Sequence, residues 1–191
     1  MNLPSPEAIA LNWWRGLQPN KPNGDPNPTA DRATLARLRR APDPTGILGE
    51  RRVLDLYGRL GYSRGQVEEL LPWVAVTAMV LAHVREHDPG RNPPRAVGPK
   101  RGDGKGETAR LKPLRFRRLL LTRDPPDVAR DMRRLVDLAD HSKLDVGKLA
   151  GALLSWGGPR GDNIRTLWAY DYYDAGDSAP VASFDEAAPA L

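Results

Sequence analysis

Apolar residues in this chain recur at spacings of three and four residues, in short segments that proline and glycine interrupt. Ile9, Trp13 and Leu17 form one such set. This spacing places apolar side chains on one face of an α-helix. The composition agrees, because Leu (25) and Ala (22) are abundant while Ile (3) and Phe (2) are scarce. No convincing pair of strands is found, so the sequence predicts an all-α fold.

About eight helices are expected, if the two segments on either side of Pro72 are counted as one interrupted helix. Ser63 and Gln66 have the spacing of a capping box, which opens this interrupted helix. Prolines and glycines mark the ends of several others. The expected helical segments are residues 6–17, 30–41, 47–60, 63–71, 73–84, 113–121, 126–140, 146–156 and 162–175.

Two internal segments lack a helical pattern. Residues 18–29 contain four prolines and three asparagines and are expected to form a loop. Residues 88–108 contain four prolines and five glycines, which predicts a flexible basic loop. We therefore expect two small helical bundles joined by this loop. The predicted units are an N-terminal bundle that ends in the loop (1–108), a C-terminal bundle (109–175) and a disordered acidic tail (176–191).

Several classes of protein are excluded by what the chain lacks. There is no cysteine, so disulfide frameworks, cysteine-ligated metals and thiol nucleophiles are ruled out. No apolar run reaches 18 residues, and the first residues do not have the pattern of a signal peptide. The sequence therefore predicts a soluble cytoplasmic protein with no membrane partner.

Charge is distributed very unevenly along the chain. The net charge is only +5. Residues 91–123, however, contain eleven basic residues against Asp103 and Glu107, a net charge of +9, and residues 171–191 contain five acids and no base. A basic segment of this kind is typical of a phosphate-binding surface.

The predicted helix 113–121 is the clearest basic element. Its expected apolar anchors are Leu114, Phe116, Leu119 and Leu120. Arg115, Arg117 and Arg118 occupy the remaining face, and the segment contains no acid. Since these arginines cannot form ion pairs within their own helix, we expect an outside partner such as phosphate.

Other arginines could have a structural role in place of a role in nucleic-acid binding. Asp131 could pair with Arg134 inside a helix, which weakens a functional interpretation of Arg133 and Arg134. Arg39 and Arg40 lie at a predicted helix C-terminus, where cations also stabilise the helix dipole. No motif of a known sequence-specific reader is present, so binding is expected to be directed at the backbone.

One motif is compatible with metal catalysis. His83, Glu86 and His87 form H-x-x-E-H, which on a helix would place both histidines on one face with the glutamate as a general base. The motif lies in the last turn before Asp88, and no third ligand is defined. Polar residues at a fraying helix end are the favoured interpretation, and a zinc hydrolase remains the minor alternative.

An ordered set of motifs resembles the CasB family, the small subunit of the type I-E Cascade complex in CRISPR immunity. These motifs are NWWRGL, LARLRRA, a basic loop before RFRRLLL, MRRLVDLAD, LLSWG and LWAYDYY, and they extend over roughly residues 5–175. The loop at residues 18–29 and the tail beyond Gly176 depart from the family pattern.

The resemblance implies an all-helical protein of two bundles, without catalytic residues, cofactor or metal. Two copies would lie together with the other Cascade subunits and contact the guide RNA–target DNA heteroduplex and the displaced strand. The nucleic-acid-binding residues that the resemblance implies are Arg39, Arg40, Lys105, Arg115, Arg118, Arg133, Arg134 and Arg160. The competing hypothesis of a different class is a stand-alone RNA- or DNA-binding protein without sequence preference.

Overall fold

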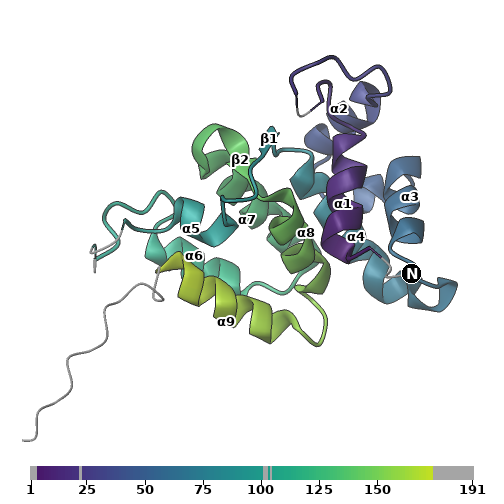
Figure 1. The fold of residues 1–191 in the computed structure, drawn as a ribbon. Helices are drawn as coiled ribbons and strands as arrows, with labels where there is room; N and C mark the ends of the chain where they lie inside the picture. Colours follow the sequence, from purple (N-terminus) through teal and green to yellow (C-terminus); the bar gives the residue numbers. More distant parts are fainter. Residues whose placement is uncertain (1–3, 22, 101–102, 104, 174–191) are drawn as a thin grey trace, which may run out of the picture.

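The computed structural model describes residues 4–21, 23–100, 103 and 105–173 (Figure 1). Within these residues nine α-helices and one pair of two-residue strands confirm the predicted all-α fold. The predicted tail 176–191 and Arg101 lie outside the described residues. The helices are α1 (Pro6–Arg15), α2 (Arg32–Arg40), α3 (Arg51–Arg59), α4 (Val67–Leu81), α5 (Pro93–Val97), α6 (Pro113–Leu121), α7 (Pro125–Leu138), α8 (Val146–Ser155) and α9 (Gly161–Tyr172).

Side-chain caps and prolines explain where several helices begin. The side chains of Ser5, Asp31 and Asp145 accept hydrogen bonds from backbone N–H groups in the first turns of α1, α2 and α8. These bonds satisfy donors that a helix N-terminus leaves free. Proline occupies the first helical positions of α1, α6 and α7, where the missing N–H costs nothing.

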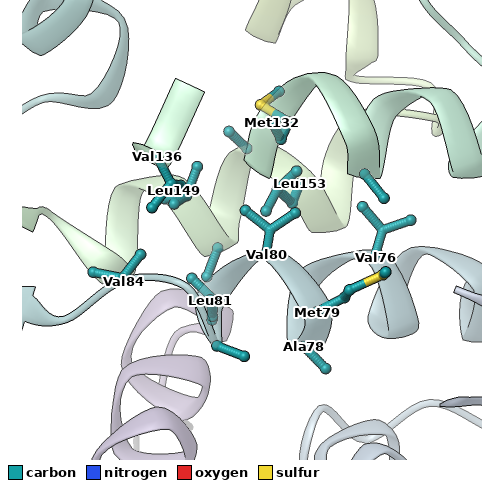
Figure 2. Packing of buried hydrophobic residues seen from close by; sticks show 14 of the residues in the cluster. Val76, Ala78, Met79, Val80, Leu81, Val84, Met132, Val136, Leu149 and Leu153 are labelled. Atoms are coloured by element: carbon teal, nitrogen blue, oxygen red, sulfur yellow. The ribbon is translucent and has the colours of Figure 1, made fainter. Parts of the chain in front are cut away.

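Helix α4 lies at the centre of the fold and packs on α3, α7 and α8. Its residues from Trp73 to Leu81 are all buried, which agrees with the continuous apolar run in this part of the sequence. Figure 2 shows Val76 and Val80 of α4 facing the helices that carry Met132 and Leu153. Helix α1 also packs along α8.

The buried side chains on both sides of the 88–108 segment belong to one hydrophobic cluster. The indole nitrogen of Trp14 in α1 donates to the Leu81 carbonyl at the end of α4, 3.0 Å away. Helices α6 and α9 lie side by side and pack through the stacked rings of Phe116 and Tyr172 (Figure 1). The division into two bundles stays a prediction.

The 88–108 segment differs from the flexible loop that its composition predicts. Residues Pro93–Val97 form helix α5, which packs on α7 and α9. Val97 is fully buried. Gly98 follows directly, and its backbone lies against the carbonyl of Tyr172. Sequence patterns do not reveal this helix, because its burial comes from contacts with α9, which lies far along the chain.

The end of the central helix also differs from the prediction. The helix continues through Pro72 and ends at Leu81, three residues earlier than expected. The chain then forms strand β1 (Glu86–His87), which pairs in parallel with β2 (Lys143–Leu144). Such short strands carry no alternating pattern, so tertiary packing alone places them.

Candidate nucleic-acid interface

Helix α6 presents an arginine-rich face to solvent. Phe116 and Leu119 are buried against the core, whereas Arg115, Arg117 and Arg118 are exposed. None of these three arginines forms an ion pair with another described residue. The predicted anchor Leu114 is wrong, because its side chain is 77% exposed. Helix α6 therefore buries a narrower apolar stripe than its sequence suggests and leaves its positive charge available to a partner.

Arginines of α6 and α7 converge on a small pocket. Arg115 and Arg118 of α6 line it together with Arg134 and Asp131 of α7, around a volume of about 70 Å³. Asp131 pairs with Arg130, 3.4 Å away, rather than with Arg134. Asp131 and Arg134 are thus not within 4.0 Å of each other, and Arg134 forms no ion pair among the described residues.

A second group of basic side chains lies where α2 and α4 end beside α7. Arg39 Nε donates to the carbonyl oxygen of Ala82 at 2.6 Å. Arg133 of α7 donates to the carbonyl oxygen of Ala41 at 2.9 Å. Arg39 is exposed as a whole residue, yet burial around its guanidinium lowers its pKa, and the neighbouring charge of Arg85 lowers this pKa further. The structure thus brings the end of α2 next to the second half of α7.

Helix α7 links the two groups, because Arg133 and Arg134 are consecutive residues. Arg133 reaches the end of α2, and Arg134 lines the pocket with α6. Six of the eight predicted binding residues therefore lie on α2, α6 and α7, and α7 contacts each of the other two helices. We call this set of arginines the basic band, and it consists of Arg39, Arg40, Arg115, Arg118, Arg133 and Arg134.

Lys105 and Arg160 lie at opposite ends of α6, outside the basic band. Lys105 is exposed in the turn before α6, next to Gly106, which packs on the ring of Pro113. Arg160 is exposed at the start of α9, in a turn that the indole nitrogen of Trp156 ties to the Thr122 carbonyl. In the described part of the chain no hydrogen bond or ion pair connects either side chain to the basic band.

Several other arginines of the basic segment are paired with acids from elsewhere in the chain. Arg91 and Arg110 both lie within 4.0 Å of Asp140, and Arg123 lies 3.5 Å from Asp162. These partners are distant in sequence, so the local charge count could not reveal them. The charge of the 91–123 segment is thus partly neutralised by the fold, and α6 contributes three of its cations that have no ion pair among the described residues.

The H-x-x-E-H motif does not form a helical metal site. Because α4 ends at Leu81, His83 lies in a turn while Glu86 and His87 lie in β1. His87 Nδ1 accepts a hydrogen bond from the Val146 N–H at 3.2 Å. Within the described residues no three metal-ligating side chains are close enough to hold an ion. The structure thus removes the helical geometry on which the zinc-hydrolase alternative depended.

His83 is instead a half-buried neighbour of the basic band. Burial lowers its pKa; the nearby Asp137 raises it, and the charges of Arg133 and Arg39 lower it. Its Nδ1 lies 4.0 Å from an Asp137 carboxylate oxygen, and its Nε2 has no hydrogen-bond partner among the described residues. A neutral His83 therefore adds no charge to this part of the band.

Comparisons with known proteins agree with this all-helical architecture. A family model described as CRISPR-associated protein Cse2 (CRISPR_cse2) matches residues 34–173, well over half of the chain. Among solved structures, CasB from Thermobifida fusca is similar with a TM-score of 0.58 at 23% identity. The similarity covers 88% of this chain and 95% of that one. No curated protein sequence matches. In addition, no described helix is long and apolar enough to cross a membrane.

The extent of the family match shows which family the chain belongs to. It contains α3 to α9 and all but the first two residues of α2, and so it contains every residue of the basic band. The structural similarity shows that the fold is shared over nearly the whole of the compared chain. The resemblance found in the sequence motifs is confirmed: the chain belongs to the Cse2 (CasB) family, a family of subunits of the type I-E CRISPR Cascade complex.

Proposed function

We propose that this chain is a non-catalytic, nucleic-acid-binding small subunit of a type I-E Cascade complex, which stabilises the R-loop through the basic band. One observation carries the proposal. Six arginines come from three helices in which α7 contacts both α2 and α6, and none of the six forms an ion pair with another described residue. Arginines without an acidic partner favour an anion from outside the chain, and the planar guanidinium matches phosphate oxygens.

The chemistry of the band favours the nucleic-acid backbone over the bases. Guanidinium groups on three helices can contact several phosphates at once, and such contacts do not depend on sequence. The tryptophans of the described residues are largely buried, so they offer no exposed stacking platform. The band is therefore suited to hold strands whose sequence is read by base pairing elsewhere.

R-loop formation needs only modest stabilisation by contacts to the nucleic-acid backbone. Exchange of a DNA duplex for an RNA–DNA heteroduplex is nearly balanced in free energy, so backbone contacts can tip it. The proposed partners are the guide RNA–target DNA heteroduplex, the displaced strand, the other Cascade subunits and a second copy of this chain, in the cytoplasm. Lys105 and Arg160 would extend the contact beyond the two ends of α6.

The test is R-loop formation by the assembled complex. Cascade would be reconstituted with the wild-type chain or with Arg115→Ala, Arg118→Ala and Arg133→Ala combined, and the opened target strand would be followed by its reactivity toward permanganate. We expect the variant to assemble normally and to form fewer and shorter-lived R-loops, because three phosphate contacts are lost in each copy.

A matched control removes three charges that the fold already neutralises. Arg37, Arg59 and Arg130 are paired with Glu50, Asp55 and Asp127, respectively. Their combined replacement by Ala lowers the net charge equally and should leave R-loops unchanged. Equal R-loop lifetimes for the wild type and the band variant would refute the proposed role of the band, provided that both complexes contain the subunit.

A further inference from the structure

A second polar site lies outside the basic band. A pocket of about 430 Å³ opens between the end of α1, the 18–29 loop and the β1–β2 pair. This volume is within the range of small-molecule sites, about 300–1,000 Å³. None of the six arginines of the band lines it. Its lining includes Arg15, Gln18, Lys21, Arg85, Glu86 and His87.

One wall of the pocket is the 18–29 loop, whose described residues are held against the end of α1. The side-chain amide of Asn27 donates to the carbonyl oxygens of Arg15 (3.3 Å) and Gln18 (3.0 Å). Asn20 and Pro26 form an antiparallel bridge, which closes the loop on itself. The loop thus positions Gln18 and Lys21 at the pocket.

The opposite wall is the β1–β2 pair and the turn before β2. The Arg85 N–H donates to the carbonyl oxygen of Ser142 at 3.0 Å, which ties this turn to the residue before β1. His141 and Ser142 have φ angles of 53° and 50°, in the left-handed region that residues other than glycine rarely adopt. Backbone strain of this kind concentrates at functional sites.

The pocket is rich in positive charge and hydrogen-bond donors. Arg15, Lys21 and Arg85 form no ion pair with any described residue. Glu86 is the one acid in the lining, and Lys143 already neutralises it from 2.7 Å away. The fold therefore leaves three cations facing a cavity without a counter-charge.

One buried and one half-buried side chain add neutral donors to these cations. Gln18 is only 6% exposed, and its side-chain nitrogen has no hydrogen-bond partner among the described residues. His87 accepts a hydrogen bond at Nδ1, so the neutral ring carries its proton on Nε2 and can donate from there. A buried donor without a partner is costly, and an oxygen-rich anion would satisfy it.

We propose that this pocket binds the phosphate group of a nucleotide. The cations and donors suit a multivalent oxyanion, and the volume leaves room for the attached sugar. The indole nitrogen of Trp14 is already bonded to Leu81, and the ring is buried, so the pocket offers no platform for stacking of the base. The pocket therefore recognises a phosphate group, either on a free nucleoside monophosphate or at the end of a nucleic-acid strand.

The position of the pocket relates it to the band. Arg85 lines the pocket and also acts electrostatically on Arg39 of the basic band. A strand that lies over the band at Arg39 is therefore close to the pocket. Phosphate binding in the pocket does not depend on the band, because the two sets share no residue.

The binding test uses inorganic phosphate and adenosine monophosphate at constant ionic strength, with the full-length chain. Titration calorimetry measures the stoichiometry, and ¹⁵N NMR follows the Gln18 side-chain amide. We expect one site per chain and a shift of the Gln18 resonance with both probes. The variant Lys21→Ala with Arg85→Ala should weaken binding by about tenfold or more, since charge-assisted hydrogen bonds are lost.

Two controls separate the pocket from the band and from unfolding. Arg115→Ala with Arg118→Ala should leave phosphate binding unchanged, and the thermal midpoint of the pocket variant should match that of the wild type. If the pocket variant unfolds, the Gln18 shift in the wild-type chain still decides the question. Absence of saturable binding and of any Gln18 shift would overturn the proposal, as would equal weakening by the band variant.

Oligonucleotides with and without a 5′-phosphate distinguish the source of the phosphate. A preference for the phosphorylated strand that the pocket variant loses would assign the pocket to strand ends. Binding of adenosine monophosphate without such a preference would assign it to free nucleotides. Loss of R-loop stability in the band variant is a separate result, so failure of the pocket and failure of the band can be told apart.

Discussion

At the scale of single residues, ion pairing determines which arginines remain available. Arg130 and Arg134 lie four residues apart on α7, yet Arg130 is paired with Asp127 and Asp131 while Arg134 is not paired within the described chain. The sequence places both close to Asp131 and does not show which of them pairs with it. Because pair formation depends on side-chain direction, the free arginines become visible only in the structure.

The pH dependence of stability should report the burial of His83. Burial lowers the pKa of this imidazole in the folded chain, so the unfolded chain takes up the proton first as the pH falls. The free energy of unfolding should therefore be unaffected by His83 above about pH 6.5, and should decrease below it by at most about 1.4 kcal/mol per pH unit.

The measurement is urea unfolding at pH 7 and pH 5.5. His83→Leu should remove this part of the pH dependence, and His141→Asn, at a side chain that is 87% exposed, serves as the control. An unchanged pH dependence in His83→Leu would show that His83 does not carry this effect. Carboxylates with lowered pKa, such as Asp31 and Asp162, lose their contribution only at more acidic pH.

At the scale of elements, local signals and tertiary contacts account for different parts of the fold. Helices α6, α7 and α8 were predicted to within two residues at each end, because prolines, Asp145 and apolar spacing mark them. Helix α5 and the β1–β2 pair were missed, since contacts with distant segments form them. Apolar character alone also does not identify the buried face of α3, because Leu54 is 47% exposed while Val53 and Leu56 are buried.

The same division applies to the candidate site. The sequence placed Arg115 and Arg118 on one helix face and both are exposed there, because the apolar spacing of α6 sets their direction. It could not show that Arg133 meets the end of α2, because the contact to Ala41 joins residues far apart in the chain. It also gave Arg85 no role, because the contacts that place Arg85 at the pocket involve residues far along the chain.

Gly98 tests the packing of α5 on α9. A Cβ at this position would overlap the carbonyl oxygen of Tyr172, which is backbone and cannot move aside easily. Gly98→Ala should therefore lower the free energy of unfolding by about 1–3 kcal/mol. Chemical denaturation measures the change, and Gly46→Ala, where no atom lies within 4 Å, is the matched control. Equal stability of the two variants would contradict the close contact between α5 and α9.

At the scale of the whole molecule, a small net charge conceals a strongly polarised surface. The net charge is +5, yet the fold pairs many charges and leaves the six arginines of the basic band without an ion pair among the described residues. A partner with regularly spaced phosphates is the one that such a band can contact at several points. The number of phosphates contacted is therefore the quantity that best characterises this surface.

The salt dependence of nucleic-acid binding measures that number directly. For single-stranded DNA, each neutralised phosphate contributes about −0.7 to the slope of log K against log salt concentration, so about five contacts give a slope of about −3.5. Combined replacement of Arg115, Arg118 and Arg134 by Ala should reduce the magnitude of the slope by about 2. The charge-matched variant of Arg37, Arg59 and Arg130 should keep the wild-type slope. Identical slopes for the wild type and the band variant would contradict the assignment of this surface to phosphate binding.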